Sequence, residues 1–114
     1  MEGCLFCAIV RGDIDSDILR QGDQTIAFRD INPQAPMHAL VIPRQHLTNA
    51  ADLTHEHAGL LAEMVATAQW VARAEGVDGS GYRLVLNVGA DGGQTVGHLH
   101  MHVLGGRQMT WPPG

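Results

Sequence analysis

The chain has 114 residues, 45% of them apolar, so it is long enough to bury the core of one globular domain and too short for two. Its net charge is -5 and its arginines are dispersed, which argues against nucleic acid as a partner, while the absence of lysine excludes a P-loop or Schiff-base lysine. No apolar run reaches about 18 residues, and residues 1–4 lack the basic and apolar regions of a signal peptide. These features predict one soluble, cytoplasmic domain over residues 1–114, with no membrane contact.

The N-terminal region contains both cysteines, Cys4 and Cys7, as a Cys-x-x-Cys pair. This spacing occurs in redox-active pairs and in one half of a zinc site, and it does not by itself decide between them. A redox pair needs a preceding strand to deliver it to a helix N-terminus, and only three residues precede Cys4. We therefore favour zinc, which requires two further ligands. Residues 4–11 are predicted to form a short helix that ends at Gly12.

A hairpin is predicted next, with strands over residues 18–21 and 25–30 joined by a glycine turn. The segment that follows contains two prolines and little periodicity, so we expect a loop. The next strand, residues 38–43, begins with His38, and His46 lies just beyond its end. We expect this strand to lie beside the histidine-rich segment near the C-terminus.

A long helix is predicted to run to about residue 75, with Thr54 or Asp52 as its N-cap and Gly76 after its end. Apolar residues recur along it at the i, i+3 and i+4 positions of one helix face: Leu60, Leu61, Met64, Val65, Ala68, Val71 and Ala72. This helix is expected to cover one face of a sheet.

A further strand is predicted over residues 82–88, followed by a glycine-rich connection at residues 89–96. An ordinary flexible hairpin loop is one interpretation of this connection. The other is an anion site, because small residues let backbone N–H groups approach a phosphate closely, and Gln94 and Thr95 add donors.

Three of the seven histidines, His98, His100 and His102, alternate with apolar residues in the segment that follows. This period of two is typical of a half-buried strand, which would place the three imidazoles on one face, about 6.6–6.8 Å apart. Aligned imidazoles gain no stability and would repel one another if charged. The pattern therefore indicates chemistry, either metal binding or nucleophilic and acid–base catalysis.

The predicted elements together indicate an α+β fold: an antiparallel sheet of about five strands with one long helix and a short N-terminal helix. The segment from His98 to Leu104 resembles the signature of the histidine-triad family, in which three histidines alternate with apolar residues. The flanking segments 91–94, 105–109 and 111–114 resemble the Hint branch of that family, the nucleoside phosphoramidases. The upstream segments Asp30–Ile31, 33–36, His38 and 41–43 extend the resemblance over nearly the whole chain.

The resemblance implies an activity in which His100, the middle histidine, attacks the α-phosphorus of a purine nucleoside 5′-phosphoramidate of the AMP-amine or AMP-lysine type. The amine leaves, a nucleotidyl-histidine intermediate forms, and water releases the nucleoside monophosphate. His98, His102 and His38 would orient the ring, help to protonate the leaving group and stabilise phosphoryl charge. A neutral imidazole, with a reference pKa of about 6.5, is suited to this attack at cytoplasmic pH.

The resemblance also implies a set of nucleotide contacts. Asp30 would bind the ribose hydroxyls and Ile31 the base. The phosphate would be surrounded by Asn87, Gly93, Gln94, Thr95, His100 and His102. Gly97 stands where well-known members have an aromatic residue, so the pocket edge is expected to be more open. Members of this branch form homodimers in which the C-terminal tail reaches the partner's active site, which would give Trp111 a docking surface.

The cysteine pair resembles that of bacterial histidine-triad proteins with a structural zinc, whose ligands would correspond to Cys4, Cys7, His46 and His98. Zinc would then fasten the N-terminus to the sheet. In that case His98 is tied to the metal and unavailable as a proton carrier in the reaction, and its role is to fix the strand next to His100.

Three alternatives stay open at this stage. A catalytic metal held by His98, His100 and His102 would make a metallohydrolase with chelator-sensitive turnover, although no glutamate is obviously placed as its base. A nucleotide-binding module with incidental hydrolysis would bind nucleoside monophosphates with negligible turnover. A dinucleoside polyphosphate hydrolase is a nearer rival, and the Hint-like tail argues against it.

Overall fold

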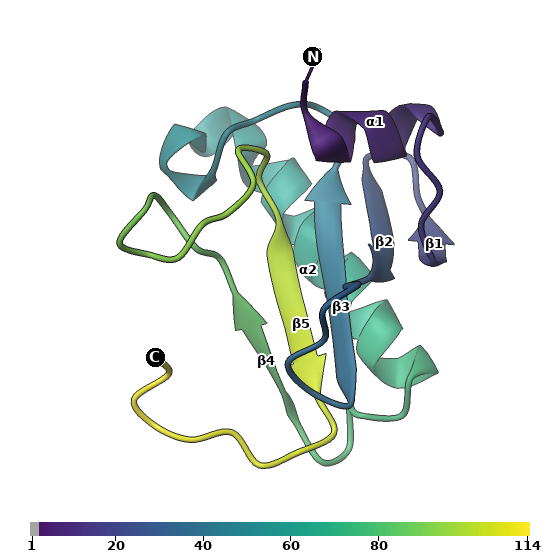
Figure 1. Cartoon of the computed structure of the whole chain (residues 1–114), viewed down its shortest axis with the longest axis vertical. Helices are drawn as coiled ribbons and strands as arrows, with labels where there is room; N and C mark the ends of the chain where they lie inside the picture. The colour runs from purple at the N-terminus through teal and green to yellow at the C-terminus, as the bar shows by residue number, and fades with distance from the viewer. Residues whose placement is uncertain (1–2) are drawn as a thin grey trace.

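An antiparallel sheet backed by one long helix organises residues 3–114, the part of the chain that this computed structural model describes (Figure 1). The helices and strands run as follows: α1 Leu5–Arg11, β1 Ile18–Gln21, β2 Thr25–Arg29, β3 Met37–Pro43, α2 Ala58–Ala74, β4 Tyr82–Val85 and β5 Met101–Gly105. The five described strands are ordered β1-β2-β3-β5-β4, and every neighbouring pair is antiparallel. The predicted α+β fold is confirmed.

Helix α1 begins and ends where the sequence predicts. Cys4 is its N-cap, with its sulfur accepting a hydrogen bond from the Cys7 N–H at 3.3 Å, and Gly12 ends it in the left-handed conformation at φ 79°. A helix of this length is not stable alone in water. Its stability comes from one apolar cluster, which joins Phe6 and Ile9 of the helix to residues of the sheet, Ile26, Phe28, Leu40 and Ile42.

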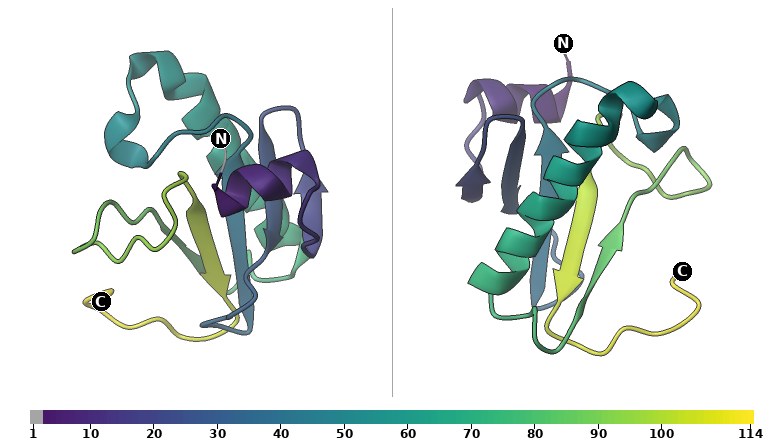
Figure 2. Two further views of the ribbon diagram at one scale, coloured as in Figure 1. Left: turned by 45° about the horizontal axis from the view of Figure 1, so that its top comes forward. Right: turned by 180° about the vertical axis from the view of Figure 1, so that it is seen from behind.

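Strand β3 is buried along its whole length because both faces of the sheet are covered at this strand. Ala39 and Val41 pack with the apolar face of α2, while Leu40 and Ile42 pack with α1. Figure 2 shows α2 crossing the sheet on the opposite face from α1. β3 is therefore held on both faces, and it pairs with β5, the strand that contains His102.

Helix α2 confirms the predicted apolar face, but its first turn differs from the prediction. Thr54 caps a 3-10 turn over His55–His57, and the α-helix proper begins at Ala58. The buried face also contains a polar residue, Thr67, whose hydroxyl hydrogen-bonds the Thr25 hydroxyl at 2.7 Å. Across the described part of the chain, no helix is both long enough and apolar enough to span a bilayer.

The last two strands are shorter than predicted. β4 ends at Val85 rather than at residue 88, and β5 begins at Met101 rather than before His98. The last pair between β4 and β5 is Val85 with His102, and the last pair between β3 and β5 is Val41 with Met101, so the residues before Met101 have no partner in either neighbouring strand. The Leu99 N–H donates instead to the Leu47 carbonyl, outside the sheet. Leu99, Met101 and Val103 pack in the core as predicted, but His98 and His100 are buried too, so burial alternates only from Met101 onward.

Candidate functional site

The predicted row of three histidines divides into two groups. His100 and His102 stay together, with ring centroids 5.1 Å apart, and both line one cavity. The His98 side chain is fully buried and lies instead among Cys4, Cys7 and His46. One segment of chain thus supplies two different sites.

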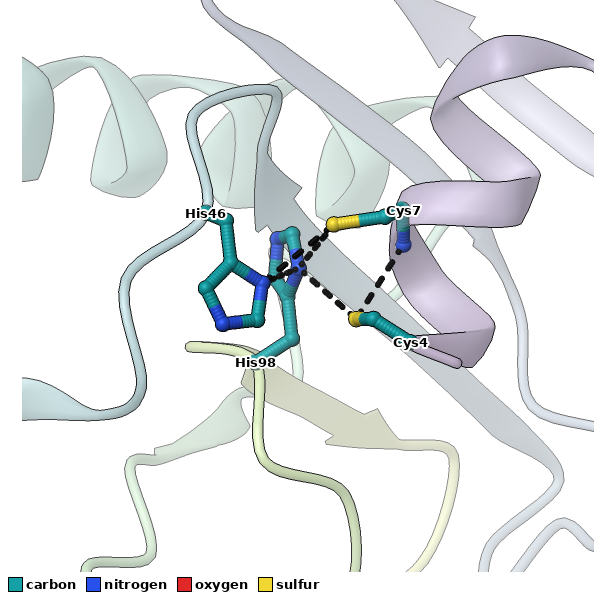
Figure 3. Close-up of side chains that lie close together, drawn as sticks. All are labelled: Cys4, Cys7, His46 and His98. Carbon is teal, nitrogen blue, oxygen red and sulfur yellow. Dashed lines mark hydrogen bonds between the residues drawn. The ribbon is translucent and has the colours of Figure 1, made fainter. Parts of the chain in front are cut away.

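The first site is a cluster of two thiols and two imidazoles (Figure 3). The Nδ1 atom of His98 lies 3.4 Å from the Cys4 sulfur, 3.5 Å from the Cys7 sulfur and 3.2 Å from Nδ1 of His46. The Cys7 sulfur is also 3.2 Å from His46 Nδ1. One ring nitrogen has either one hydrogen or one lone pair, so it cannot form three such hydrogen bonds. A tetrahedral ion with these ligands would hold neighbouring ligand atoms about 3.3–3.8 Å apart, which agrees with the observed spacing.

The second nitrogen of His98 fixes how the ring can act. Nε2 donates a hydrogen bond to the Pro43 carbonyl at 2.9 Å, so Nδ1 of the neutral ring has a lone pair directed at the cluster. Burial lowers the pKa of His98, which favours that neutral form. Burial also raises the pKa of the Cys7 thiol, so a thiolate there needs a cation beside it. The donor set therefore fits a metal ion.

The second site is centred on His100. Its Nδ1–H donates to the main-chain carbonyl of His98 at 2.7 Å. A carbonyl can only accept, so the proton of the neutral ring is on Nδ1 and the lone pair is on Nε2. The ring is 5% exposed and packs edge-on against Phe6 with centroids 5.2 Å apart. His100 is thus held as an oriented nucleophile or base.

His102 has the opposite tautomer because of a hydrogen-bonded chain. The Gln34 backbone N–H donates to Nδ1 of His38 at 3.0 Å, which leaves the proton of neutral His38 on Nε2. That atom donates to Nδ1 of His102 at 2.9 Å, and the Asp30 carboxylate lies 3.4 Å from it. His102 therefore carries its proton on Nε2. The cavity is lined by one imidazole with a lone pair and another with an N–H.

The hydrogen bonds of His38 and His98 exclude two other possible metal sites. Asp30, His38 and His102 also lie close enough to share an ion. His38 would have to bind through Nε2 while Nδ1 accepts the Gln34 N–H, which requires an imidazolate. The predicted alternative of a metal shared by His98, His100 and His102 fails as well, because both nitrogens of His98 face other partners. The cysteine–histidine cluster is the metal site that fits.

The cavity beside His100 has a volume of about 240 Å³. Its walls are largely apolar, with contributions from α1, β2 and β3: Leu5, Phe6, Ile9, Phe28 and Leu40. Besides the two histidines, the polar lining residues are Asp15, Ser16, Arg29, Asp30 and Thr95. Ile31 lies at the cavity with 97% of its surface exposed. A larger hollow of about 530 Å³ is formed by residues 80–83 and 106–109, and its lining contains no histidine. The smaller cavity therefore has the composition of a small-molecule site.

The structure brings together most of the predicted nucleotide contacts. Five line the cavity: Asp30, Ile31, Thr95, His100 and His102. Asn87 and Gly93 lie next to each other, with the Asn87 amide nitrogen 4.0 Å from where a Cβ on Gly93 would be, but neither lines the cavity. Trp111 is 83% exposed at the C-terminal tail. Phe6 was not among the predicted site residues, although its place between the two cysteines is a signal that could have identified it.

The Gln94 side chain already has a structural task. Its carbonyl oxygen accepts from the Asn49 amide at 3.1 Å and from the Gly89 N–H at 2.9 Å, and its amide donates to the carbonyls of Thr48 and Val96. These bonds tie the glycine-rich loop to the segment after β3. The side chain thus orders the loop beside the cavity, and the predicted phosphate contact of Gln94 stays a prediction.

Comparison with known proteins identifies the family. The HIT domain family matches residues 11–109. This chain belongs to the HIT family. An uncharacterized HIT-like protein of Synechococcus elongatus is 49% identical over 113 residues, covering 99% of this chain and 98% of that protein. The crystal structure of a HIT family hydrolase from Legionella pneumophila has a TM-score of 0.96 at 49% identity, covering 98% of this chain and 100% of that one. A HIT family hydrolase from Clostridium thermocellum has a TM-score of 0.94 at 41% identity, with 96% of each chain covered.

In this HIT chain the environment keeps the second site neutral. Burial lowers the pKa of His102 to about 4, and the neighbouring imidazoles of His100 and His38 act in the same direction, opposed by the Asp30 carboxylate. Burial also lowers the pKa of His38, again opposed by Asp30. Both rings are therefore neutral at pH 7, as their hydrogen-bonded chain requires.

We predict a pH-dependent stability from His102. Its pKa is about 4 in the folded chain and near its ordinary value of 6.5 when unfolded, so the unfolded chain binds more protons between these values. Stability is then full above pH 6.5 and falls as the pH falls toward 4. Thermal unfolding from pH 7 to pH 4, compared with His102→Gln, tests this. The variant should show a flatter dependence, and equal slopes for the two proteins would contradict the assignment.

Proposed function

We propose that this chain cleaves the P–N bond of purine nucleoside 5′-phosphoramidates through a nucleotidyl-histidine intermediate on His100. HIT family membership supports a nucleotide hydrolase or transferase. The observation that carries the proposal is the hydrogen bond from His100 Nδ1 to the His98 carbonyl, which leaves the Nε2 lone pair on a ring that lines the cavity.

The cavity suits a nucleotide from one end to the other. Its apolar walls and Ile31 would hold the purine, and the Asp30 carboxylate would accept hydrogen bonds from the ribose hydroxyls. Thr95, beside the two histidines, would bind the phosphate, with the predicted contacts at Asn87, Gly93 and Gln94 around it. The nucleotide would thus place its α-phosphorus next to His100.

In the first step, His100 Nε2 forms a bond to phosphorus and the P–N bond to the amine breaks. The imidazole becomes positively charged, and the His98 carbonyl stabilises that charge through the Nδ1 hydrogen bond. The His102 N–H stabilises the phosphoryl oxygens, and the departing amine takes up a proton that solvent supplies beside the His38–His102 pair. Water then attacks phosphorus, the bond from His100 Nε2 to phosphorus breaks, and the proton lost by the water returns to solvent as the nucleoside monophosphate leaves. The predicted role of His98 is thereby reduced to positioning, because its own nitrogens are engaged elsewhere.

We further propose that Cys4, Cys7, His46 and His98 hold a structural zinc ion. Two thiolates and two imidazoles in a tetrahedral arrangement are a donor set typical of structural zinc. Bound there, the ion would join α1 to the segments after β3 and before β5. It would not contact the substrate.

A homodimer is also proposed, with Trp111 reaching the partner's cavity. Strand β4 is at an edge of the sheet, and its neighbourhood exposes apolar side chains, Leu84 and Val88. The C-terminal tail runs beside this edge, where the Arg83 guanidinium donates to the Thr110 carbonyl at 2.9 Å. Pairing of two such edges would bring one tail near the other chain.

The activity is tested by AMP release from an amine-substituted adenosine 5′-phosphoramidate. We expect turnover by the wild type that survives chelation, a loss of at least about 10³-fold in His100→Ala, and little change in His55→Ala, a control at an exposed turn. Absence of wild-type turnover would reject the proposal, and so would activity that chelation abolishes in a protein that stays folded. Diadenosine polyphosphates assayed in parallel should be poorer substrates, and the reverse order would favour the polyphosphate hydrolase.

The zinc proposal predicts one ion per chain in the purified protein. Metal analysis should show that ion lost from the Cys4→Ser/Cys7→Ser double variant, with a lower melting temperature, because the remaining histidines cannot hold it. His38→Ala is the matched control and should keep its metal, since His38 belongs to the other group. Metal retained by the double variant and lost from His38→Ala would instead place the ion at the second site.

A further inference from the structure

Helix α1 belongs to both sites at once. Cys4 at its N-cap and Cys7 in its first turn are two of the four residues of the metal cluster. Leu5, Phe6 and Ile9 of the same helix line the nucleotide cavity. A ligand in the cavity and an ion in the cluster would therefore each contact residues of this one helix.

Phe6 is a residue of α1 whose ring packs against both His98 and His100. Its ring centroid lies 5.2 Å from that of His100 and 6.0 Å from that of His98, edge-on in both cases. The side chain is 4% exposed and also packs against Phe28 of the sheet, with centroids 5.5 Å apart. A shift of α1 therefore moves an aromatic ring that packs against the nucleophile.

His98 joins the same two sites from the sheet side. Its Nδ1 faces the cluster, and its main-chain carbonyl accepts the hydrogen bond that sets the tautomer of His100. The proposed ion would thus bind both α1, through Cys4 and Cys7, and the segment that contains His98, and each of these contacts His100. Because α1 is too short to be stable alone, its place depends on these tertiary contacts.

We propose that α1, through Phe6, couples metal binding at the cysteine–histidine cluster to nucleotide binding in the cavity that Phe6 and His100 line. Phe6 is then a positioning residue for His100. The inference rests on the proposed nucleotide site and metal site and adds a thermodynamic link between them. An ion that orders α1 completes the cavity wall, and a nucleotide that packs on the same wall orders the metal ligands.

Such a link is reciprocal: the factor by which metal improves nucleotide affinity must equal the factor by which nucleotide improves metal affinity. We expect a factor of about 5–20, the lower part of the range for coupling between two sites. A metal that only stabilises the fold at a distance would leave both affinities unchanged.

The test measures both halves of this cycle. AMP affinity is measured by calorimetry on zinc-loaded and metal-free protein, with circular dichroism to confirm that the metal-free protein is folded. Zinc affinity is measured by chelator competition on the wild type with and without saturating AMP, which needs no metal-free fold. Ribose 5-phosphate serves as a ligand control, because it has the phosphate but no base to pack against α1. AMP should tighten zinc binding about 5–20-fold and ribose 5-phosphate should do so little.

Two variants locate the coupling. Phe6→Ala should bring the AMP effect on zinc affinity close to one, and Phe6→Leu should restore part of it. Val10→Ala is the matched control, because Val10 is an apolar residue of the same helix that packs in its cluster but does not line the nucleotide cavity. It should leave the coupling factor unchanged.

The outcomes separate this inference from the proposed function. If zinc-loaded wild type fails to bind AMP, the proposed function is wrong and the coupling falls with it. If it binds AMP but the affinity of each ligand is independent of the other, the coupling alone is overturned. A coupling factor that survives in Phe6→Ala would overturn the role assigned to Phe6, and so would a factor that Val10→Ala reduces as much as Phe6→Ala does.

Discussion

The geometry of His98 is the constraint on which the rest of the site depends. Its Nε2 is committed to the Pro43 carbonyl, its Nδ1 to the cysteine–histidine cluster, and its main-chain carbonyl to His100. The three engagements exclude a shared metal with its neighbours and fix the proton of His100 on Nδ1. The ring of His100, the proposed nucleophile two residues later in the chain, is thus oriented by the His98 carbonyl.

His100 and His102 have opposite tautomers, and in each case a hydrogen bond to a neighbouring group sets the tautomer. A backbone N–H at Gln34 determines the tautomer of His38, and His38 determines that of His102. The cavity is therefore lined by a lone pair from His100 and an N–H from His102, which would face the phosphoryl group of the proposed substrate. His102 and His38 are neutral because burial lowers the pKa of each ring.

The sequence predicted the elements of the fold well, because periodicity and glycine positions are local signals. It misplaced the start of β5 and the end of β4, since those limits depend on which residues find a partner across the sheet. The grouping of Cys4, Cys7, His46 and His98 came from a family resemblance, and the structure brings these residues together. The tautomer of His102 and the bonds from Gln94 to Asn49 and Thr48 could not be predicted, because they join segments far apart in the chain.

The most direct test of the account is the stereochemical course of the reaction at phosphorus. Hydrolysis of a single diastereomer of an adenosine 5′-phosphoramidothioate in ¹⁸O-labelled water yields a chiral thiophosphate whose configuration can be measured. Attack by His100 followed by water inverts phosphorus twice, so the account predicts net retention. Net inversion would mean that water displaces the amine in one step, and it would contradict covalent catalysis at His100.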